Sequence, residues 1–122
     1  MTGDYARAAQ ALERSLHICR EIGDRGAEAD GLNEMGTVHR VRGDLSRART
    51  CHRQALDIAH QISSSWDQAH GLAGLGRCDL ATGLTASGQA LLRQAGDIFQ
   101  EIGAAEADEV AAELGALDEP VR

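Results

Sequence analysis

Aromatic residues are scarce in this sequence: phenylalanine, tyrosine and tryptophan each occur once and make up 2% of the 122 residues. Single-stranded nucleic acids are commonly bound by stacking their bases on aromatic side chains, so this mode of binding is disfavoured. Basic residues are also in short supply, with 12 Lys and Arg against 19 Asp and Glu and a net charge of −7. Because nucleic acids and anionic membranes attract basic surfaces, the composition predicts no direct binding to either and weakly favours basic partners.

Long apolar runs are absent as well. No segment approaches the roughly 20 apolar residues that a membrane-spanning helix needs. The N-terminal residues MTGDYARAAQ lack the charged and apolar regions of a signal peptide. The three cysteines, Cys19, Cys51 and Cys78, are odd in number and far apart in sequence, which favours free thiols in the core. Together these observations predict a protein of the reducing cytoplasm.

An internal repeat covers almost the whole chain. Gly3, Gly43 and Gly83 follow one another at intervals of forty residues and divide the chain into units 3–42, 43–82 and 83–122. Matched residues of the first two units include Gly3/Gly43, Asp4/Asp44, Leu16/Leu56, Ile18/Ile58, Ile22/Ile62, Leu32/Leu72 and Gly36/Gly76. A period of this length is typical of stacked supersecondary units that bury their apolar faces against one another. We therefore expect one repeat domain over residues 1–122.

Each unit carries two helical patterns separated by a turn. Gly23 is placed to end the first helix and Asp24 to cap the second, and Gly43 and Asp44 repeat this arrangement. Small and apolar residues of the first unit recur at three- and four-residue steps, as a buried helix face requires: Ala8, Ala11, Leu12, Ser15, Leu16 and Cys19. No strand pattern occurs. The sequence predicts an all-α fold of about six helices, at residues 4–22, 25–42, 44–62, 65–82, 85–102 and 105–117.

Glycine is common inside these helices, although each one costs up to about 1 kcal/mol relative to alanine. Gly36 and Gly76 occupy the same position in successive units, each after a large apolar residue. This position predicts a close approach of two helix backbones, where any side chain would clash. In the third unit Gly88 and Gly96 replace an alanine and a leucine of the second unit, which predicts looser packing there.

The order of large, small and glycine residues resembles the tetratricopeptide repeat. One repeat is represented by Leu32, Met35, Gly36, His39, Ala48, His52 and Ala55, and the next by Leu72, Leu75, Gly76, Asp79, Gly88, Leu92 and Ala95. Residues 4–22 resemble the second half of a repeat whose first helix is missing. The resemblance implies helix–turn–helix units stacked as a right-handed superhelix, an α-solenoid. The sequence departs from the family where His39, His52 and Asp79 stand in place of aromatic residues.

The forty-residue spacing is longer than the common repeat of about 34 residues. It resembles the longer-helix class found in kinesin light chains, in cell-polarity scaffolds and in large bacterial transcriptional regulators, and this sequence is most similar to the last group. The segments GDYARAAQALERSL and FQEIGAAEADEVAAELGAL resemble the C-terminal repeat regions of actinobacterial antibiotic-regulatory proteins and of signal-transducing ATPase regulators. This resemblance implies a fragment of a longer chain, whose DNA-binding and nucleotide-binding parts lie outside it. The implied function is a non-catalytic protein–protein interaction module with a regulatory, effector-sensing role.

The first helix of each pair lines the concave face in this family. The resemblance therefore implies that the exposed concave positions are Asp30, Asn33, Glu34, Thr37, Arg40 and Val41 in one helix and His70, Ala73, Gly74, Arg77, Leu80 and Ala81 in the next. Asn33 is suited to hydrogen bonds with a peptide backbone, and Arg40 and Arg77 are suited to holding a carboxylate. Three uses of this face stay open: an extended protein or peptide segment, an apolar helix of the same or another chain, or a solvated face without a ligand.

The sequence predicts no catalytic, metal or cofactor site. The histidines show no spacing at which several would converge on a metal ion, and no nucleophile stands with a base in a way that predicts an enzyme. His52 replaces Leu12 and Leu92 of the other units, so we expect it to be partly buried and hydrogen-bonded. Trp66 is expected to pack over the joint between repeats, or alternatively to anchor a partner as an exposed aromatic residue.

The N-terminal helix predicts a self-association face. As the second helix of an incomplete repeat, it is expected to leave apolar surface exposed at Tyr5, Ala8, Ala9, Leu12 and Leu16. Such patches tend to be covered by another chain, here an upstream helix or a second copy in a two-fold dimer. The alternative to a binding module is accordingly a structural or self-associating fragment with no external ligand in its groove.

Overall fold

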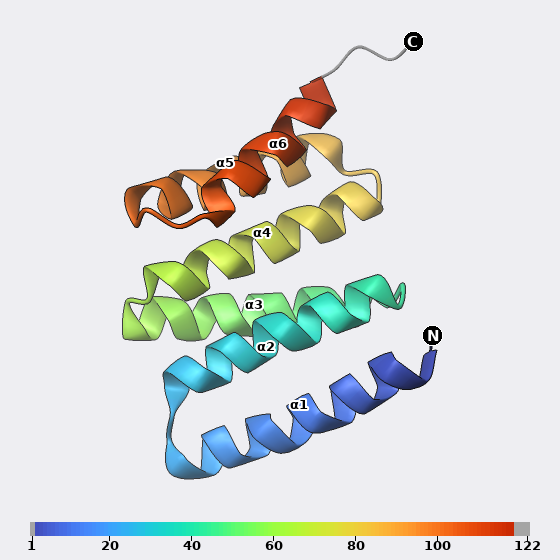
Figure 1. The fold of residues 1–122 in the computed structure, drawn as a ribbon, viewed down its shortest axis with the longest axis vertical. Coiled ribbons are helices and arrows are strands. Elements are labelled where there is room, and N and C mark those ends of the chain that lie inside the picture. The colour runs from blue at the N-terminus through green and yellow to red at the C-terminus, as the bar shows by residue number, and fades with distance from the viewer. Residues whose placement is uncertain (1, 119–122) are drawn as a thin grey trace.

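The computed structural model describes residues 2–118, which form six α-helices and no strand (Figure 1). The helices are α1 (Thr2–Ile22), α2 (Arg25–Val41), α3 (Leu45–Ile62), α4 (Ser65–Ala81), α5 (Thr85–Glu101) and α6 (Glu106–Asp118). Every predicted helix is present, with its ends within two residues of the predicted ones. Residues 119–122 of the third repeat unit lie outside the described residues. The predicted all-α helical-repeat fold is confirmed.

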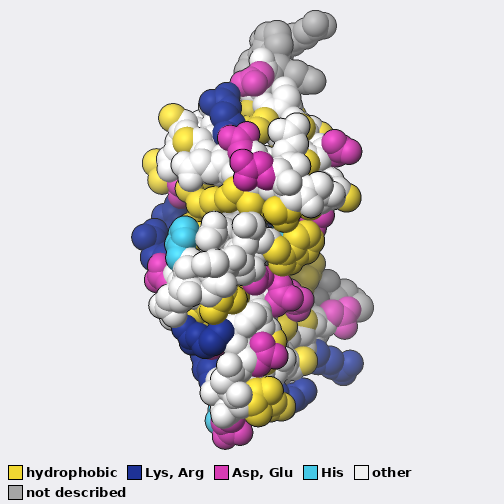
Figure 2. Space-filling model, turned by 90° about the vertical axis from the view of Figure 1, so that its left-hand side faces the viewer, with side chains coloured by type: hydrophobic (Ala, Val, Ile, Leu, Met, Phe, Trp, Pro, Cys, Tyr) yellow, Lys and Arg dark blue, Asp and Glu magenta, His cyan; other side chains and the backbone are white. Residues whose placement is uncertain are grey.

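The helices are stacked in chain order, from α1 at one end of the molecule to α6 at the other (Figure 1). Each helix packs against the next, and α2 also contacts α4 directly although α3 lies between them in sequence. The inner helices α2 and α4 therefore share one side of the solenoid. None of the described helices is both long and apolar enough to cross a membrane. On the side shown in Figure 2, charged side chains of both signs are interspersed.

Every turn between the helices contains a residue in the left-handed backbone region. Four of these residues are glycines, which adopt positive φ without steric cost, and Ser63 takes the equivalent position between α3 and α4 with φ 56°. The side chains of Asp24, Asp44 and Ser64 then cap the following helices by accepting hydrogen bonds from backbone N–H groups. Leu84 stands in the same place before α5 and makes no such bond.

Two apolar clusters form the core. The first joins α1, α2 and α3 through Ala9, Leu16, Ala29, Leu32, Met35, Ala55 and Ile58. The second joins α4, α5 and α6 through Ala69, Ala73, Leu92, Ala95, Phe99 and Val110. All three cysteines are free thiols; Cys19 and Cys78 are buried and Cys51 is half-buried.

The prediction of a looser third unit is wrong at Gly88. A Cβ atom there would lie 2.7 Å from Leu80 Cγ and 2.9 Å from the carbonyl oxygen of Gly76. The missing side chain thus lets α5 approach α4 closely. At Gly96 a Cβ atom would lie 3.2 Å from Val110, so this position is also filled by a neighbouring helix.

The predicted self-association face needs a correction, because most of it is turned into the molecule. Ala9 and Leu16 are buried in the first core cluster, and Leu12 packs against the same cluster. Ala8 is half-buried, and only Tyr5 is exposed. The apolar stripe of α1 is covered mainly by α2 of the same chain, since a helix presents its apolar face to whichever partner packs on it.

A different face of α1 is open. A shallow hollow of about 480 Å³ is lined by α1 alone, through Gln10, Glu13, Arg14, His17 and Ile18. Four of these five residues are polar. This hollow is therefore mainly polar, while Ile18 within it and Ile22 at the end of α1 are 55% and 70% exposed.

Candidate functional site: a concave groove between α2 and α4

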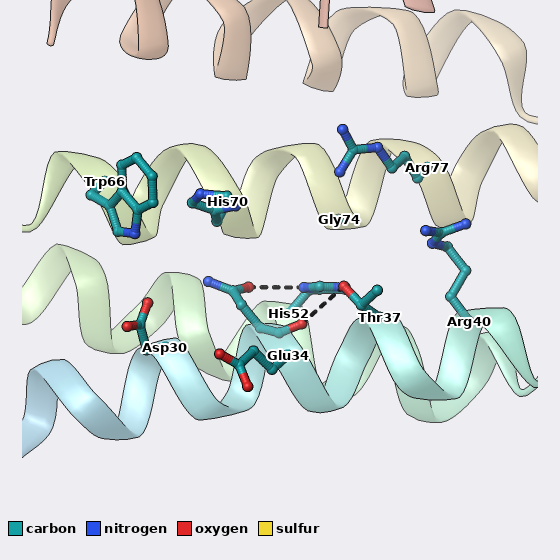
Figure 3. A pocket seen from close by; sticks show the side chains of 10 residues that line it. Asp30, Glu34, Thr37, Arg40, His52, Trp66, His70, Gly74 and Arg77 are labelled. Atoms are coloured by element: carbon teal, nitrogen blue, oxygen red, sulfur yellow. Dashed lines mark hydrogen bonds between the residues drawn. The ribbon is translucent and has the colours of Figure 1, made fainter. Parts of the chain in front are cut away.

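The inner helices enclose a groove of about 410 Å³ (Figure 3). All seven residues of the predicted peptide-binding face line it: Asp30, Asn33, Glu34, Thr37, Arg40, His70 and Arg77. The lining also includes His52, Trp66 and Gly74. Sequence analysis did not place His52 in the groove, because this residue belongs to the outer helix α3. The glycines at positions 36 and 74 could have indicated this, because they leave room for a side chain from α3.

The two ends of the groove differ in charge. Asp30 lies in the first half of α2 and Glu34 near its middle, whereas Arg40 on α2 and Arg77 on α4 lie at the opposite end (Figure 3). Ten residues separate Asp30 from Arg40, which corresponds to about 15 Å along an α-helix. The groove is therefore dipolar along its length.

His52 forms the floor of the groove. Its side chain reaches from α3 between α2 and α4 and is only 2% exposed. A Cβ atom at Gly36 would lie 2.5 Å from His52 Nε2, and one at Gly74 would clash with the opposite part of the ring. The two glycines thus form the slot that holds the imidazole. Gly36 lies at a helix contact, as predicted, but the space beside it is filled by the His52 ring and not by the backbone of a neighbouring helix.

The hydrogen bonds of His52 define its protonation. Its Nδ1 lies 2.8 Å from Asn33 Oδ1, and since an amide oxygen only accepts, Nδ1 carries the proton. Nε2 is buried without a hydrogen-bond partner among the described residues. Burial, together with the positive charges of Arg40, Arg77 and His70, lowers the pKa of His52 to about 4. His52 is therefore neutral at pH 7, and the expectation of a buried, hydrogen-bonded histidine is confirmed.

Asn33 does not have the exposure that we expected. It is 7% exposed; its Oδ1 accepts from His52, and its Nδ2 donates to the carbonyl oxygen of Asp67 at 3.4 Å. Its amide is used to join α2, α3 and α4 and is not free to bind a peptide backbone. The expected exposure of Ala73 and Gly74 is wrong as well, since Ala73 is buried in the second core cluster and Gly74 is buried against His52.

Arg77 holds a carboxylate, and this carboxylate belongs to the chain itself. Its Nε and Nη2 donate to Glu113 of α6 at 2.9 and 2.6 Å. The hydrogen bond to Glu113 raises the pKa of Arg77, and the charge of that carboxylate adds to the effect. Glu113 was not predicted as a partner, because it lies 36 residues after Arg77 and the repeat pattern does not indicate which side chains pair between successive units. Arg40 forms no ion pair within residues 2–118.

The acidic end of the groove carries an aromatic cluster. The ring centroids of Trp66 and His70 are 4.5 Å apart, and those of His70 and Phe99 are 5.0 Å apart, with edge-to-face geometry. Trp66 packs over this contact between α4 and α5, and 42% of it is still exposed, at the groove. The Nε2 atom of His70 lies 3.3 Å from Glu106 Oε2 of α6.

A buried carboxylate lies beside the same end. Asp67 is 5% exposed; its Oδ2 accepts from Ser64 Oγ at 2.8 Å, whereas its Oδ1 has no hydrogen-bond partner among the described residues. Burial raises the pKa of Asp67; the bond from Ser64 opposes this rise, and the adjacent carboxyl of Asp30 adds to it. Two neighbouring carboxyl groups without a cation are electrostatically unfavourable, so they either retain a proton or attract a positive charge. No group of three or more side chains in residues 2–118 is arranged to hold a metal ion.

Comparison with known proteins agrees with the fold. The model of the tetratricopeptide repeat family matches residues 1–61, which is half of the chain. No curated protein matches the sequence. The matched region runs from α1 to α3 and includes the α2 side of the groove. With six stacked helices and this match, the chain belongs to the tetratricopeptide repeat family.

Proposed function

We propose that this chain is a non-catalytic module that binds an extended protein or peptide segment in the groove between α2 and α4. Tetratricopeptide repeats generally mediate protein–protein interaction and are generally non-catalytic. The observation that carries the proposal is the groove itself: it is concave, and it exposes charged side chains whose charges are only partly compensated within the chain. An apolar helix suits this lining poorly, since Asp30, Glu34 and Arg40 would lose water without gaining partners.

One observation favours the alternative of a fragment with no external ligand. The amide of Asn33 and the guanidinium of Arg77 are already satisfied by His52, Asp67 and Glu113 of the same chain. These contacts also stiffen the groove, and a preformed groove loses less entropy when it binds a peptide.

The test is a selection from a displayed library of random peptides, followed by binding measurements on two threonine variants. Thr37 lies in the groove and Thr50 lies on α3 outside it; both are exposed, and both donate a hydrogen bond to the carbonyl oxygen four residues earlier. Thr37→Arg should block the selected peptides, and the matched variant Thr50→Arg should not. Selected peptides that bind both variants equally would place the binding surface elsewhere and reject the proposal.

We also propose that the module is a regulatory region of a cytoplasmic bacterial transcriptional regulator. This proposal is supported by the resemblance of GDYARAAQALERSL and FQEIGAAEADEVAAELGAL to such regions. The sequence upstream of Met1 in the native gene product tests it. A nucleotide-binding and a DNA-binding region there would support the regulator context, and a different set of domains would reject it.

A further inference from the structure

The acidic end of the groove has the features of a site for a basic side chain. Asp30 and Glu34 are exposed carboxylates that line the groove, and the buried carboxyl of Asp67 adjoins Asp30 with one oxygen unpartnered. Asp67 lies behind the groove lining, and two neighbouring carboxyl groups favour a positive charge beside the one that is exposed, Asp30.

Trp66 adds an aromatic surface to this end. In Figure 3 the ring of Trp66, on α4, lies at the same end of the groove as Asp30, on α2. Lysine and arginine cations are attracted to the face of a tryptophan ring within about 6 Å of its centroid. A basic side chain entering between Asp30 and Trp66 would therefore meet carboxylates and an aromatic face together.

The opposite end is suited to a carboxylate. Arg77 is held by Glu113, but Arg40 forms no ion pair in the part of the chain that the structure describes, and it lines the groove. Arg40 and Arg77 line the same end of the groove, on α2 and α4 (Figure 3). A guanidinium is a preferred partner for a carboxylate, because its N–H groups can bind both oxygens.

The distance between the two ends sets a spacing in the ligand. Asp30 and Arg40 are about 15 Å apart along α2. An extended peptide advances about 3.3 Å per residue, so about four or five residues span this distance.

From this geometry we infer that the partner segment carries a lysine or arginine that binds between Asp30 and Trp66, and a carboxylate about four or five residues away that binds to Arg40. The inference rests on the proposed function and specifies the chemistry of its ligand. The carboxylate is an aspartate or glutamate side chain or the C-terminal carboxyl group, which present the same chemistry to a guanidinium.

The experiment uses synthetic peptides and the intrinsic fluorescence of Trp66, which is the only tryptophan of the chain. The first peptide carries one lysine and one glutamate four residues apart on a serine–alanine background, with both ends blocked. Two partner peptides replace the lysine by norleucine or the glutamate by glutamine. A fourth peptide has a free C-terminal carboxyl group in place of the glutamate, which separates the two carboxylate sources.

The protein variants are Asp30→Asn and Arg40→Gln, with Asp57→Asn and Arg53→Gln as matched controls. Both control residues are exposed on α3 and lie outside the groove. The first peptide should shift the emission of Trp66, and replacing its lysine should weaken binding about three- to tenfold. Asp30→Asn should remove the advantage of lysine over norleucine and leave that of glutamate over glutamine, and Arg40→Gln should do the reverse.

Failure of the inference and failure of the proposed function give different results. If library-selected peptides depend on Thr37 but carry no basic residue, or if Asp30→Asn leaves the lysine preference unchanged, the inference is overturned and the groove remains a binding site. If no selected peptide depends on Thr37, the proposed function is rejected and the inference with it. Equal effects of Asp57→Asn and Asp30→Asn would show that the preference for lysine over norleucine depends only on the net charge of the chain. This result would also overturn the inference.

Discussion

Gly36 and Gly76 hold the same position in successive repeats, yet they face different neighbours. Gly36 adjoins the imidazole of His52, which is held on its other side by Gly74; we call this arrangement the His52 joint. At Gly76 a Cβ atom would lie 3.0 Å from the backbone carbonyl oxygen of Gly88 and 3.2 Å from Leu92, in what we call the Gly88 joint. One joint is filled by a polar ring and the other by close backbone approach and leucine.

The difference shows that one repeated glycine can serve two physical purposes. In the His52 joint it makes space for a side chain from the outer helix, whose hydrogen bond to Asn33 connects α3 to α2. In the Gly88 joint it brings two backbones together, and the place of His52 is taken by Leu92. Only the His52 joint contains a group that titrates, and only this joint lies beneath the groove.

The largest expected effect is a dependence of the free energy of unfolding on pH, which arises from the His52 joint and not from the Gly88 joint. The folded state holds the pKa of His52 at about 4, below the ordinary value of 6.5, so the unfolded chain binds a proton more readily between these values. The free energy of unfolding should therefore fall as the pH is lowered from about 6.5 to about 4, by up to about 3 kcal/mol from this residue.

Urea unfolding of the wild type and of His52→Leu at pH 7, 6 and 5 measures this effect. The variant loses the bond to Asn33 and should be less stable at pH 7, but the difference should shrink as the pH falls. Carboxylates titrate in both proteins and cancel in the comparison. Parallel curves for the two proteins would contradict the protonation assigned to His52.

The next effect is steric. Gly74→Ala places a methyl group against the ring of His52, which is fixed by its buried surroundings, and should destabilise the protein by about 1–3 kcal/mol. Gly76→Ala needs a shift of only a few tenths of an ångström, and the better helix propensity of alanine offsets the strain, so its effect should stay within about 1 kcal/mol of zero.

Thermal or urea denaturation of the two alanine variants checks this order. His52→Ala combined with Gly74→Ala should cost less than the sum of the single substitutions, since the clash partner is removed. A larger loss in Gly76→Ala than in Gly74→Ala would show that backbone approach constrains the fold more tightly than the histidine slot.

The start of α5 lacks the side-chain cap that the start of α3 has, and a substitution can supply it. Leu84 has φ −84° and ψ 67°, close to the −90° and 77° of Asp44, but it provides no side-chain cap. Leu84 is 51% exposed, so its replacement loses little packing. Leu84→Asp should stabilise the protein by about 1 kcal/mol, seen as a higher urea midpoint with an unchanged slope. An unchanged midpoint would mean that this helix end is already satisfied by water.

The smallest effect concerns a glycine that faces no neighbour. A Cβ atom at Gly115 would meet nothing within 4 Å, in contrast to both joints. Gly115→Ala should raise the stability by about 0.5 kcal/mol, since alanine has the better helix propensity and the position is near the end of α6. The melting temperature measures this, and a decrease would indicate a contact that the geometry does not contain.

Much of the fold could be predicted because its signals are local. Each turn contains a glycine or serine that permits positive φ, followed in three cases by a capping residue, and the forty-residue period repeats this arrangement along the chain. The positions that line the groove were also predictable, because the repeat register determines which side of an inner helix faces inward. Arg40 and Asp30 lie where that register placed them.

The contacts of the site were less predictable because they join residues from different units. Asn33 is turned into a network with His52 and Asp67, and Arg77 is paired with Glu113 across an interval that departs from the period. The apolar stripe of α1 was identified correctly as apolar, but the pattern does not say which helix covers it. Leu16 packs inside the chain because α2 lies against it.

The sequence by itself determined the helices, their ends and the repeat, since these follow from glycine, capping residues and a periodic apolar face within short segments. The tertiary structure decided which polar groups stay available. Because three helices pack around His52, the amide of Asn33 is hydrogen-bonded within the chain. Because α6 places Glu113 beside Arg77, the guanidinium of Arg77 is hydrogen-bonded as well. Asp30, Glu34, Trp66 and Arg40 remained at the groove surface because no helix within residues 2–118 covers them.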